Sequence, residues 1–275
     1  MPGAADPLYV AARHALLDAL GALSEHLDSI VLVGAQAVYV HAGEADLAIA
    51  PFTTDGDLAL DPRNLAATPL LELALHAANF RLETNQVGVW NRDVDINGTI
   101  RTISVDLLIP ESLSGPGRRA ARIPPHAITV ARRVNGLEGA LVDRDVSTIG
   151  ALDEEDSRQF VLSVAGPSAL IVAKVHKILD RANSPDRLSD KDALDVYRLL
   201  RAVPTEVLAQ RFSLLLADEL SARVTEHALA EIPRMFGTRT SPGSQMAVRA
   251  AGLFDAGDTI AATIVVLTRE LIEAL

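Results

Sequence analysis

The chain has 275 residues, with 25 basic and 36 acidic side chains and a net charge of −11. Apolar residues make up 49% of it and there is no cysteine, which excludes wholesale disorder, disulfides, thiolate metal sites and cysteine nucleophiles. We find neither a targeting signal nor an apolar run near the ~20 residues of a membrane span, and therefore expect a cytoplasmic protein without membrane contact.

The first 165 residues alternate between helical and strand-like patterns. In chain order, the predicted elements are a helix over 7–27, strand 29–33, helix 35–41, strand 57–60, helix 68–79, strands 86–91 and 100–109, a Pro- and Gly-rich loop over 110–125, and strand-like segments up to 164 that include 126–134. We expect the third predicted helix, at 68–79, to begin with Thr68 as its cap and Pro69 in its first turn.

From residue 166 onward the pattern is helical throughout. The predicted helices cover 167–182, 189–202, 205–221, 223–235, 243–254 and 257–274. The fold class expected is therefore α/β (α+β), with a mixed sheet flanked by helices over 1–165 and a helical domain over 166–275.

Three acidic residues in the first half stand out by their spacing. Asp55 and Asp57 are two residues apart where a strand begins, so they share a face with their Cα atoms roughly 7 Å apart. Like charges this close repel one another unless a cation lies between them. Asp106 is embedded in an apolar strand, where an unpartnered carboxylate is costly. On a neighbouring strand it would complete an oxygen cage suited to Mg²⁺.

Lysine is rare and clustered in this chain. Of the 25 basic residues 22 are arginine, and the three lysines are Lys174, Lys177 and Lys191. This restriction indicates that at least one position needs a compact ammonium rather than a planar guanidinium. On a helix Lys174, Lys177 and Arg181 share one face, and Asp192 shares a face of the next helix with Asp195.

These motifs together resemble a known family. A glycine turn at Gly34 after the first strand, an acidic pair and a third acid on a later strand are similar to the nucleotidyltransferase superfamily. The Lys174 helix followed by the Asp192–Asp195 helix resembles AbiEii-type toxin nucleotidyltransferases, including the MenT-like group. The chain departs from the family pattern at Ala35, where glycine or serine is usual.

The resemblance implies transfer of a nucleoside monophosphate from an NTP to an acceptor. It implies RNA, at a tRNA 3′ end, as the acceptor, and a toxin–antitoxin setting with an antitoxin protein as partner. The implied metal ligands, for two Mg²⁺ or Mn²⁺ ions, are Asp55, Asp57 and Asp106. The implied catalytic set adds Lys174 and Asp192. The implied nucleotide-binding residues are Gly34, Ala35, Lys174, Lys177 and Arg181.

Two other functions stay open. A small-molecule nucleotidyltransferase of the aminoglycoside-modifying kind would use the same acids, and the charge of −11 favours an enzyme of that kind. A degenerate fold that only binds a partner is the third possibility, because of Ala35. The densest basic cluster is either an RNA-backbone contact or a solvated loop, and consists of Arg118, Arg119, Arg122, Arg132 and Arg133.

Overall fold

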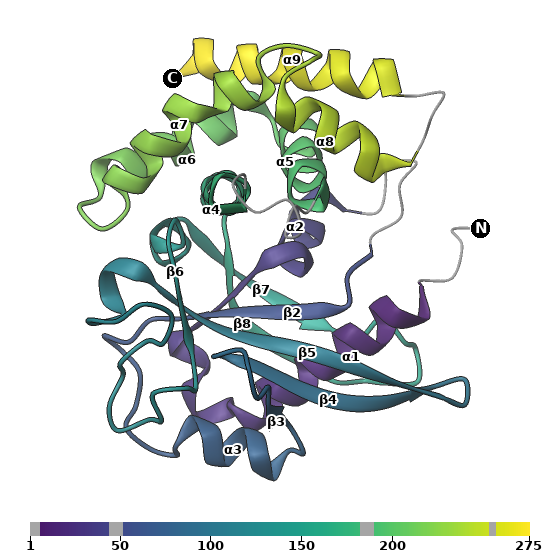
Figure 1. Cartoon of the computed structure of the whole chain (residues 1–275), viewed down its shortest axis with the longest axis vertical. Coiled ribbons are helices and arrows are strands. Elements are labelled where there is room, and N and C mark those ends of the chain that lie inside the picture. Colours follow the sequence, from purple (N-terminus) through teal and green to yellow (C-terminus); the bar gives the residue numbers. More distant parts are fainter. Residues whose placement is uncertain (1–5, 44–51, 182–189, 253–256) are drawn as a thin grey trace. The chain divides into compact units, whose positions relative to one another are not determined.

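The computed structural model describes residues 6–43, 52–181, 190–252 and 257–275. The chain forms two compact units, each assembled from three stretches of sequence (Figure 1). The first unit comprises Met1–Gln36, Ala50–Val134 and Asp145–Val164, and the second comprises Ala37–Ile49, Asn135–Arg144 and Ala165–Leu275. The domains predicted from the sequence were 1–165 and 166–275. In the structure the last stretch of the second unit begins at Ala165, and two short earlier segments also belong to that unit.

A mixed sheet forms the centre of the first unit. Its strands in the described residues are β1 (Ile30–Val33), β2 (Asp55–Leu60), β3 (Arg81–Leu82), β4 (Val89–Ile96), β5 (Thr99–Pro110), β6 (Arg132–Val134), β7 (Arg144–Gly150) and β8 (Gln159–Ala165). Their order is β3-β4-β5-β2-β1-β8-β7, with β6 paired beside β5. Parallel and antiparallel pairs are both present, since β2 runs parallel to β5 and antiparallel to β1. This confirms the predicted fold class.

Burial explains the central position of β1. All four of its residues, from Ile30 to Val33, are buried, and β-branched residues favour strands that pack on both faces. Val33 is the register partner of Asp57 on β2, and Leu32 is that of Val164 on β8. The strand that precedes the glycine turn is therefore held on both edges.

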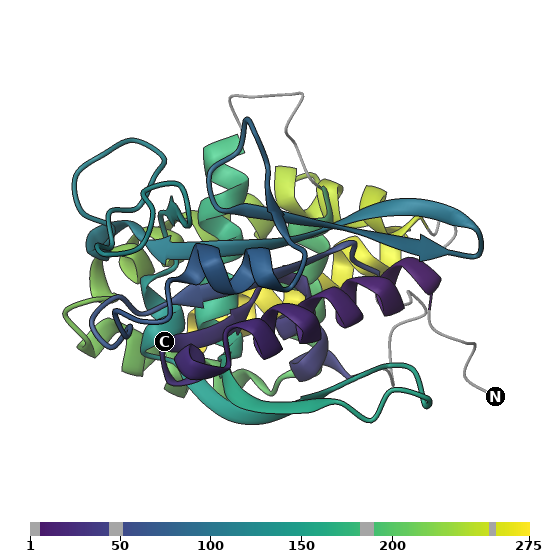
Figure 2. The same ribbon diagram turned by 90° about the horizontal axis from the view of Figure 1, so that it is seen from below.

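Two helices pack in the first unit beside the sheet. Helix α1 (Pro7–Ala22) begins with Asp6 as its N-cap, whose carboxylate accepts from the Leu8 N–H at 2.8 Å. It packs along β2, β4 and β5 and against α3 (Leu71–Ala77). Figures 1 and 2 both show α1 lying along one face of this sheet.

The helices predicted at 7–27 and 68–79 differ in their bounds from the structure. Helix α1 ends at Ala22 and a 3-10 helix, Ser24–Ser29, follows it. Helix α3 begins only at Leu71, so the prediction of Thr68 as its cap was wrong. The Leu71 N–H donates instead to Nδ1 of His126 at 3.3 Å. A side chain distant in the sequence therefore satisfies the start of this helix.

The predicted strands after residue 80 also differ. Strand β4 extends to Ile96 and is joined to β5 by Asn97 and Gly98, which have φ values of +54° and +79°. Asparagine followed by glycine in this conformation is typical of a tight hairpin turn. The segment 126–134 was predicted to be strand-like, but only Arg132–Val134 is a strand, as β6.

The second unit is mainly helical. Its principal helices are α4 (Pro167–Arg181), α5 (Asp190–Ala202), α6 (Thr205–Ala217), α7 (Ala222–Phe236), α8 (Pro242–Ala251) and α9 (Gly257–Ala274). Helix α4 packs against α5, α6 and α7, and α8 packs against α5, α7 and α9. Helix α2 (Gly34–Ala42) starts in the first unit and continues into the second. In the described ranges, no helix has the length and apolar character needed to cross a membrane.

A buried carboxylate fixes the start of α4. Asp143 accepts from the Ala169 N–H at 3.0 Å and from Nη1 of Arg211 at 2.6 Å. Its carboxylate also lies against Gly166, because a Cβ on Gly166 would be 2.2 Å from Cγ of Asp143. The negative charge therefore sits at the positive end of the helix that carries Lys174.

Candidate active site

Asp55, Asp57 and Asp106, hereafter the acid cluster, lie on neighbouring strands of the first unit. Asp57 on β2 is the register partner of Asp106 on the parallel strand β5, and Asp55 is opposite Ser104. Register partners point to the same face of a sheet, and so do residues two apart in one strand. All three carboxylates therefore project from the same face of the sheet.

The acid cluster faces away from α1. Gly56, between the two acids of β2, points toward that helix, because a Cβ there would lie 3.2 Å from Cδ1 of Leu16. Side chains alternate across a strand, so Asp55 and Asp57 point the other way. The members of the cluster are partly exposed, whereas Gly56 is buried. The carboxylates are therefore accessible to solvent, while Gly56 between them is packed against α1.

Gly34 lies directly against the carboxylate of Asp57. It begins α2 immediately after β1 and has a φ of +71°, a left-handed value that favours glycine. A Cβ on Gly34 would lie 2.7 Å from Cγ of Asp57 and nearer still to Oδ2. Both the left-handed backbone conformation and the nearby carboxylate of Asp57 therefore require glycine at position 34. Ala35 follows in the first turn of α2.

Gln36 fixes the backbone of Asp55. Its Nε2 donates to the Asp55 carbonyl at 2.9 Å, and its Oε1 accepts from Nε of Arg13 at 2.7 Å. Both side chains are buried, and burial lowers the pKa of the Arg13 guanidinium. The Thr53 hydroxyl donates to Oδ1 of Asp55. Arg13 and Gln36 were not among the predicted site residues, since neither belongs to a motif.

Asp106 is ion-paired with an arginine of the predicted basic cluster. Nη2 of Arg132 on β6 lies 2.6 Å from Oδ2 of Asp106, and Arg133 pairs with Glu111 at 2.7 Å. The other members of the basic cluster are exposed, namely Arg118, Arg119 and Arg122. The basic cluster thus consists of three exposed loop arginines and two arginines, Arg132 and Arg133, that are paired with carboxylates.

The acid cluster consists of carboxylates, the ligand type that a divalent-cation site would use. Carboxylate oxygens are the ligands that Mg²⁺ prefers in proteins, and three of them share one face. In the described part of the chain, however, no three His, Asp or Glu side chains are gathered into a group that could hold a metal ion. Oδ2 of Asp106 contacts Arg132 instead. The residues fit a divalent cation if Asp106 exchanges this arginine for the ion.

Lys174 and Asp192 belong to a buried ion-pair network in the second unit. Nζ of Lys174 lies 3.0 Å from Oδ1 of Asp192 and 2.7 Å from Oδ2 of Asp195. The Lys174 side chain is only 6% exposed. Nη1 of Arg198 reaches Oδ1 of Asp195 at 3.2 Å. The network therefore joins α4 to α5 through charges that neutralise one another.

The charges of this network determine two pKa values. Burial alone would lower the pKa of Lys174, but the carboxylates of Asp195 and Asp192 outweigh it and raise that pKa. Burial alone would raise the pKa of Asp192, yet Lys174, Lys177 and Arg181 hold it at about 2. Lys174 and Asp192 are therefore both charged at neutral pH.

The predicted cationic face of α4 converges on one carboxylate. Nζ of Lys177 lies 3.2 Å from Oδ1 of Asp192, and Nη1 of Arg181 lies 3.3 Å from Oδ2. Unlike Lys174, Lys177 is 42% exposed. Its ammonium therefore has room for another anion, whereas that of Lys174 is enclosed.

Arg198 is a further member of the network that was not among the predicted site residues. Arg198 lies with its Cζ 5.1 Å from the ring centroid of Tyr39, a cation–π contact. The spacing of Asp195 and Arg198, three residues apart on a helix, was the signal that could have found this pair. No local pattern connects either residue with Tyr39.

The predicted catalytic residues thus fall into two groups. The acid cluster is assembled within the first unit, and Lys174 with Asp192 is assembled within the second. The structure brings each group together inside its own unit. Each group is therefore a candidate site with chemistry of its own.

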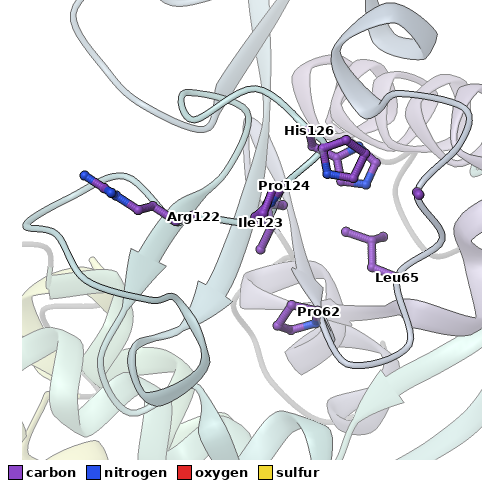
Figure 3. Close-up of a pocket in the computed structure, with 8 residues that line it drawn as sticks. Pro62, Leu65, Arg122, Ile123, Pro124 and His126 are labelled. Atoms are coloured by element: carbon purple, nitrogen blue, oxygen red, sulfur yellow. The ribbon is translucent and has the colours of Figure 1, made fainter.

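A separate cavity of about 210 Å³ lies in the first unit, beside the loop that carries the exposed arginines. It is lined by Pro62, Leu65, Ala67, Arg122, Ile123, Pro124, Pro125 and His126. Figure 3 shows the Arg122 side chain extending away from Leu65 and His126. Nε2 of His126 contacts the Ala66 carbonyl at 3.0 Å while Nδ1 accepts from Leu71. His126 is thus a packing residue, and burial lowers its pKa.

Comparison of the chain with protein-family models, with curated proteins and with solved structures found no match in any of the three.

Proposed function

We propose that the protein is a Mg²⁺-dependent nucleotidyltransferase that moves a nucleoside monophosphate from an NTP to an acceptor hydroxyl. The observation that carries the proposal is the pairing of Asp57 with Asp106 across β2 and β5, with Asp55 on the same face. The strand–Gly34–helix turn lies directly against this cluster. Carboxylates on adjacent strands beside a helix start suit the binding of a metal-bound triphosphate.

The chain's own residues position the reactants in this reaction. Asp55, Asp57 and Asp106 would hold two Mg²⁺ or Mn²⁺ ions, and backbone N–H groups at Gly34 and Ala35 would donate to phosphate oxygens. When bound, such ions neutralise phosphate charge and favour ionisation of the acceptor hydroxyl. Gln36 and Thr53 keep Asp55 in place.

The chemical step is an in-line displacement. The acceptor oxygen forms a bond to the α-phosphorus, the bond from that phosphorus to the pyrophosphate oxygen breaks, and pyrophosphate leaves. The hydroxyl proton passes to a carboxylate of the acid cluster. Because no covalent enzyme intermediate forms, catalysis depends on orientation and charge neutralisation.

The contribution of the second unit is a separate part of the proposal. A contact of Lys174 with the triphosphate would require its ammonium to exchange contacts with Asp192 and Asp195. Lys177 and Arg181 are more exposed and need less rearrangement to meet an anion. Asp192 contacts all three of these α4 cations and so holds them on the same side of the helix.

RNA is the acceptor that we propose, at a tRNA 3′ end and as the target of a toxin that an antitoxin protein neutralises in the cytoplasm. Its support is the exposed loop of Arg118, Arg119 and Arg122, since arginines bind phosphate backbones. The net charge of −11 favours a small cationic acceptor instead. An acceptor assay distinguishes RNA from a small cationic acceptor.

The experiment supplies α-labelled NTPs with Mg²⁺, and offers total RNA and a panel of aminoglycosides as acceptors. The wild type should label RNA, and Asp57→Asn should abolish labelling. Asp93→Asn is the matched control, because Asp93 is an exposed carboxylate on β4 paired with Arg81. Labelling of the aminoglycosides alone would replace the RNA proposal. Labelling of neither acceptor would favour a protein that only binds a partner.

A further inference from the structure

The ion pair between Arg132 and Asp106 places a guanidinium within the proposed cation site. Nη2 of Arg132 lies 2.6 Å from Oδ2 of Asp106, a distance typical of a charge-assisted hydrogen bond. A divalent cation that used this carboxylate oxygen would compete with the arginine for it. Arg132 therefore occupies Oδ2 of Asp106, the oxygen that would coordinate the ion in the proposed function.

The backbone of Arg132 is held from two sides. It lies on β6, parallel to β5 and opposite Leu108, and it forms a bridge with Ala120 on the other side. Gly88, with a φ of +74°, lies so close that a Cβ there would be 2.5 Å from the Arg132 nitrogen. The fold therefore fixes the base of this side chain beside Asp106.

The end of the Arg132 side chain is less constrained. Its side chain is 34% exposed, and its Nε is buried without a hydrogen-bond partner. An arginine can offer Nε and one Nη together to a phosphate, in a bidentate contact. The contact with Asp106 uses only Nη2. Nε has no partner among the residues that the structure describes, and a ligand can reach it once the side chain leaves Asp106.

Arg133, the next residue, provides a contrast. It donates to Oε1 of Glu111 at 2.7 Å, and to the carbonyls of Gly115 and Gly117. These partners lie in the loop after β5, and none of them belongs to the acid cluster. A neutral residue at 133 removes the same charge from the same strand without touching Asp106. It is therefore a matched control for substitution of Arg132.

We infer that Arg132 is an exchangeable counter-ion of the acid cluster. Without a divalent cation it neutralises Asp106, and when the cation and nucleotide bind it moves to the triphosphate, to which it donates from Nε and Nη2. This inference rests on the proposed function. It makes Arg132 a positioning residue that couples cation binding to nucleotide binding.

The first test measures Mn²⁺ binding by calorimetry in the absence of nucleotide. Arg132→Gln should bind Mn²⁺ roughly tenfold more tightly than the wild type, because one competing charged hydrogen bond is gone. Arg133→Gln should match the wild type. Unchanged or weaker Mn²⁺ binding by Arg132→Gln would overturn the inference. Thermal unfolding verifies that each variant is folded, and the neutral variant Arg132→Met replaces Arg132→Gln, with the same expected result, if that variant is not.

The second test measures binding of an NTP analogue with a methylene between the α- and β-phosphates, at saturating Mn²⁺. Arg132→Gln should bind the analogue several-fold more weakly, and Arg132→Lys should restore only part of the affinity because it lacks the planar fork. Equal affinity in all three proteins would overturn the transfer of Arg132 to the triphosphate. Neither test needs turnover, so a failure to label any acceptor would refute the proposed function without deciding this inference.

Discussion

The carboxylate of Asp57 occupies the space where a side chain at Gly34 would begin. We predict that Gly34→Ala lowers the free energy of unfolding by about 2–4 kcal/mol, because alanine would have to keep a φ of +71° and displace Asp57. Denaturant unfolding measures this loss. Gly98→Ala is the control, since Gly98 has a φ of +79° and no atom within 4 Å of an added Cβ. It should lose only about 1–2 kcal/mol. Equal losses would show that contact with Asp57 contributes nothing.

Asp57→Asn should leave the stability of the protein unchanged or raise it, by up to about 1 kcal/mol. The substitution removes one of three like charges from one face of the sheet. Asp61→Asn, at the end of β2, should instead lose about 1–3 kcal/mol. Asp61 is buried and accepts from the Arg63 N–H at 3.0 Å and from its Nε at 2.8 Å. Thermal unfolding compares the two, and a large loss for Asp57→Asn would make that residue structural.

Lys174→Met should destabilise the second unit by about 3–5 kcal/mol. It leaves the buried carboxylates of Asp192 and Asp195 without their shared ammonium. Lys177→Met should cost under about 1 kcal/mol, because Lys177 is 42% exposed. Hydrogen exchange of α4 and α5 measures both. If the two variants behave alike, the buried network does not hold these helices together.

Acid should weaken the second unit in a defined pH window. The pKa of Asp192 is about 2 in the folded protein and 3.8 ordinarily, so its ion pairs stabilise the fold above pH 4. That contribution, roughly 2 kcal/mol, is lost as the pH falls from about 4 to about 2. Protection factors of α4 across this range measure the loss, and Asp192→Asn should remove this dependence. An unchanged pH slope in the variant would assign the effect to other groups.

RNA binding, if RNA is the acceptor, should depend steeply on salt. Each phosphate contact contributes about 0.7–0.9 to the slope of log affinity against log salt. Replacing Arg118, Arg119 and Arg122 by alanine should therefore flatten the slope by about 2 and leave NTP affinity unchanged. A matched triple variant at other exposed arginines, namely Arg101, Arg201 and Arg239, keeps the same net charge. Equal slopes in the two variants would exclude the loop as the RNA contact.

Sequence patterns predicted the mixed sheet, the helical second half and most helix bounds within a few residues. These features depend on local periodicity, as in α4 and α9, whose starts at Pro167 and Gly257 match the predicted positions. The start of α3 could not be predicted in this way, because its first N–H is satisfied by His126 from a distant loop. The tight turn at Asn97-Gly98 carried a local signal that the sequence analysis did not use.

For the candidate site, too, local patterns were predictable and contacts between distant residues were not. The shared face of Asp55 and Asp57 follows from strand periodicity alone. The pairing of Asp106 with Arg132 depends on β6 lying beside β5, and no spacing in the sequence predicts that. The burial of Lys174 between Asp192 and Asp195 was equally invisible, since helix periodicity shows which residues share a face and not what covers it.

The sheet order has a consequence during synthesis. Among the described strands, β1 is the first to be made, yet its parallel neighbour β8 comes last. At the usual translation rates, the edge of β1 that pairs with β8 stays without this partner for roughly ten seconds. An unpaired strand edge is a template for pairing with other chains. Recovery of soluble protein from cells should therefore depend on how fast the chain is synthesised and on chaperone supply.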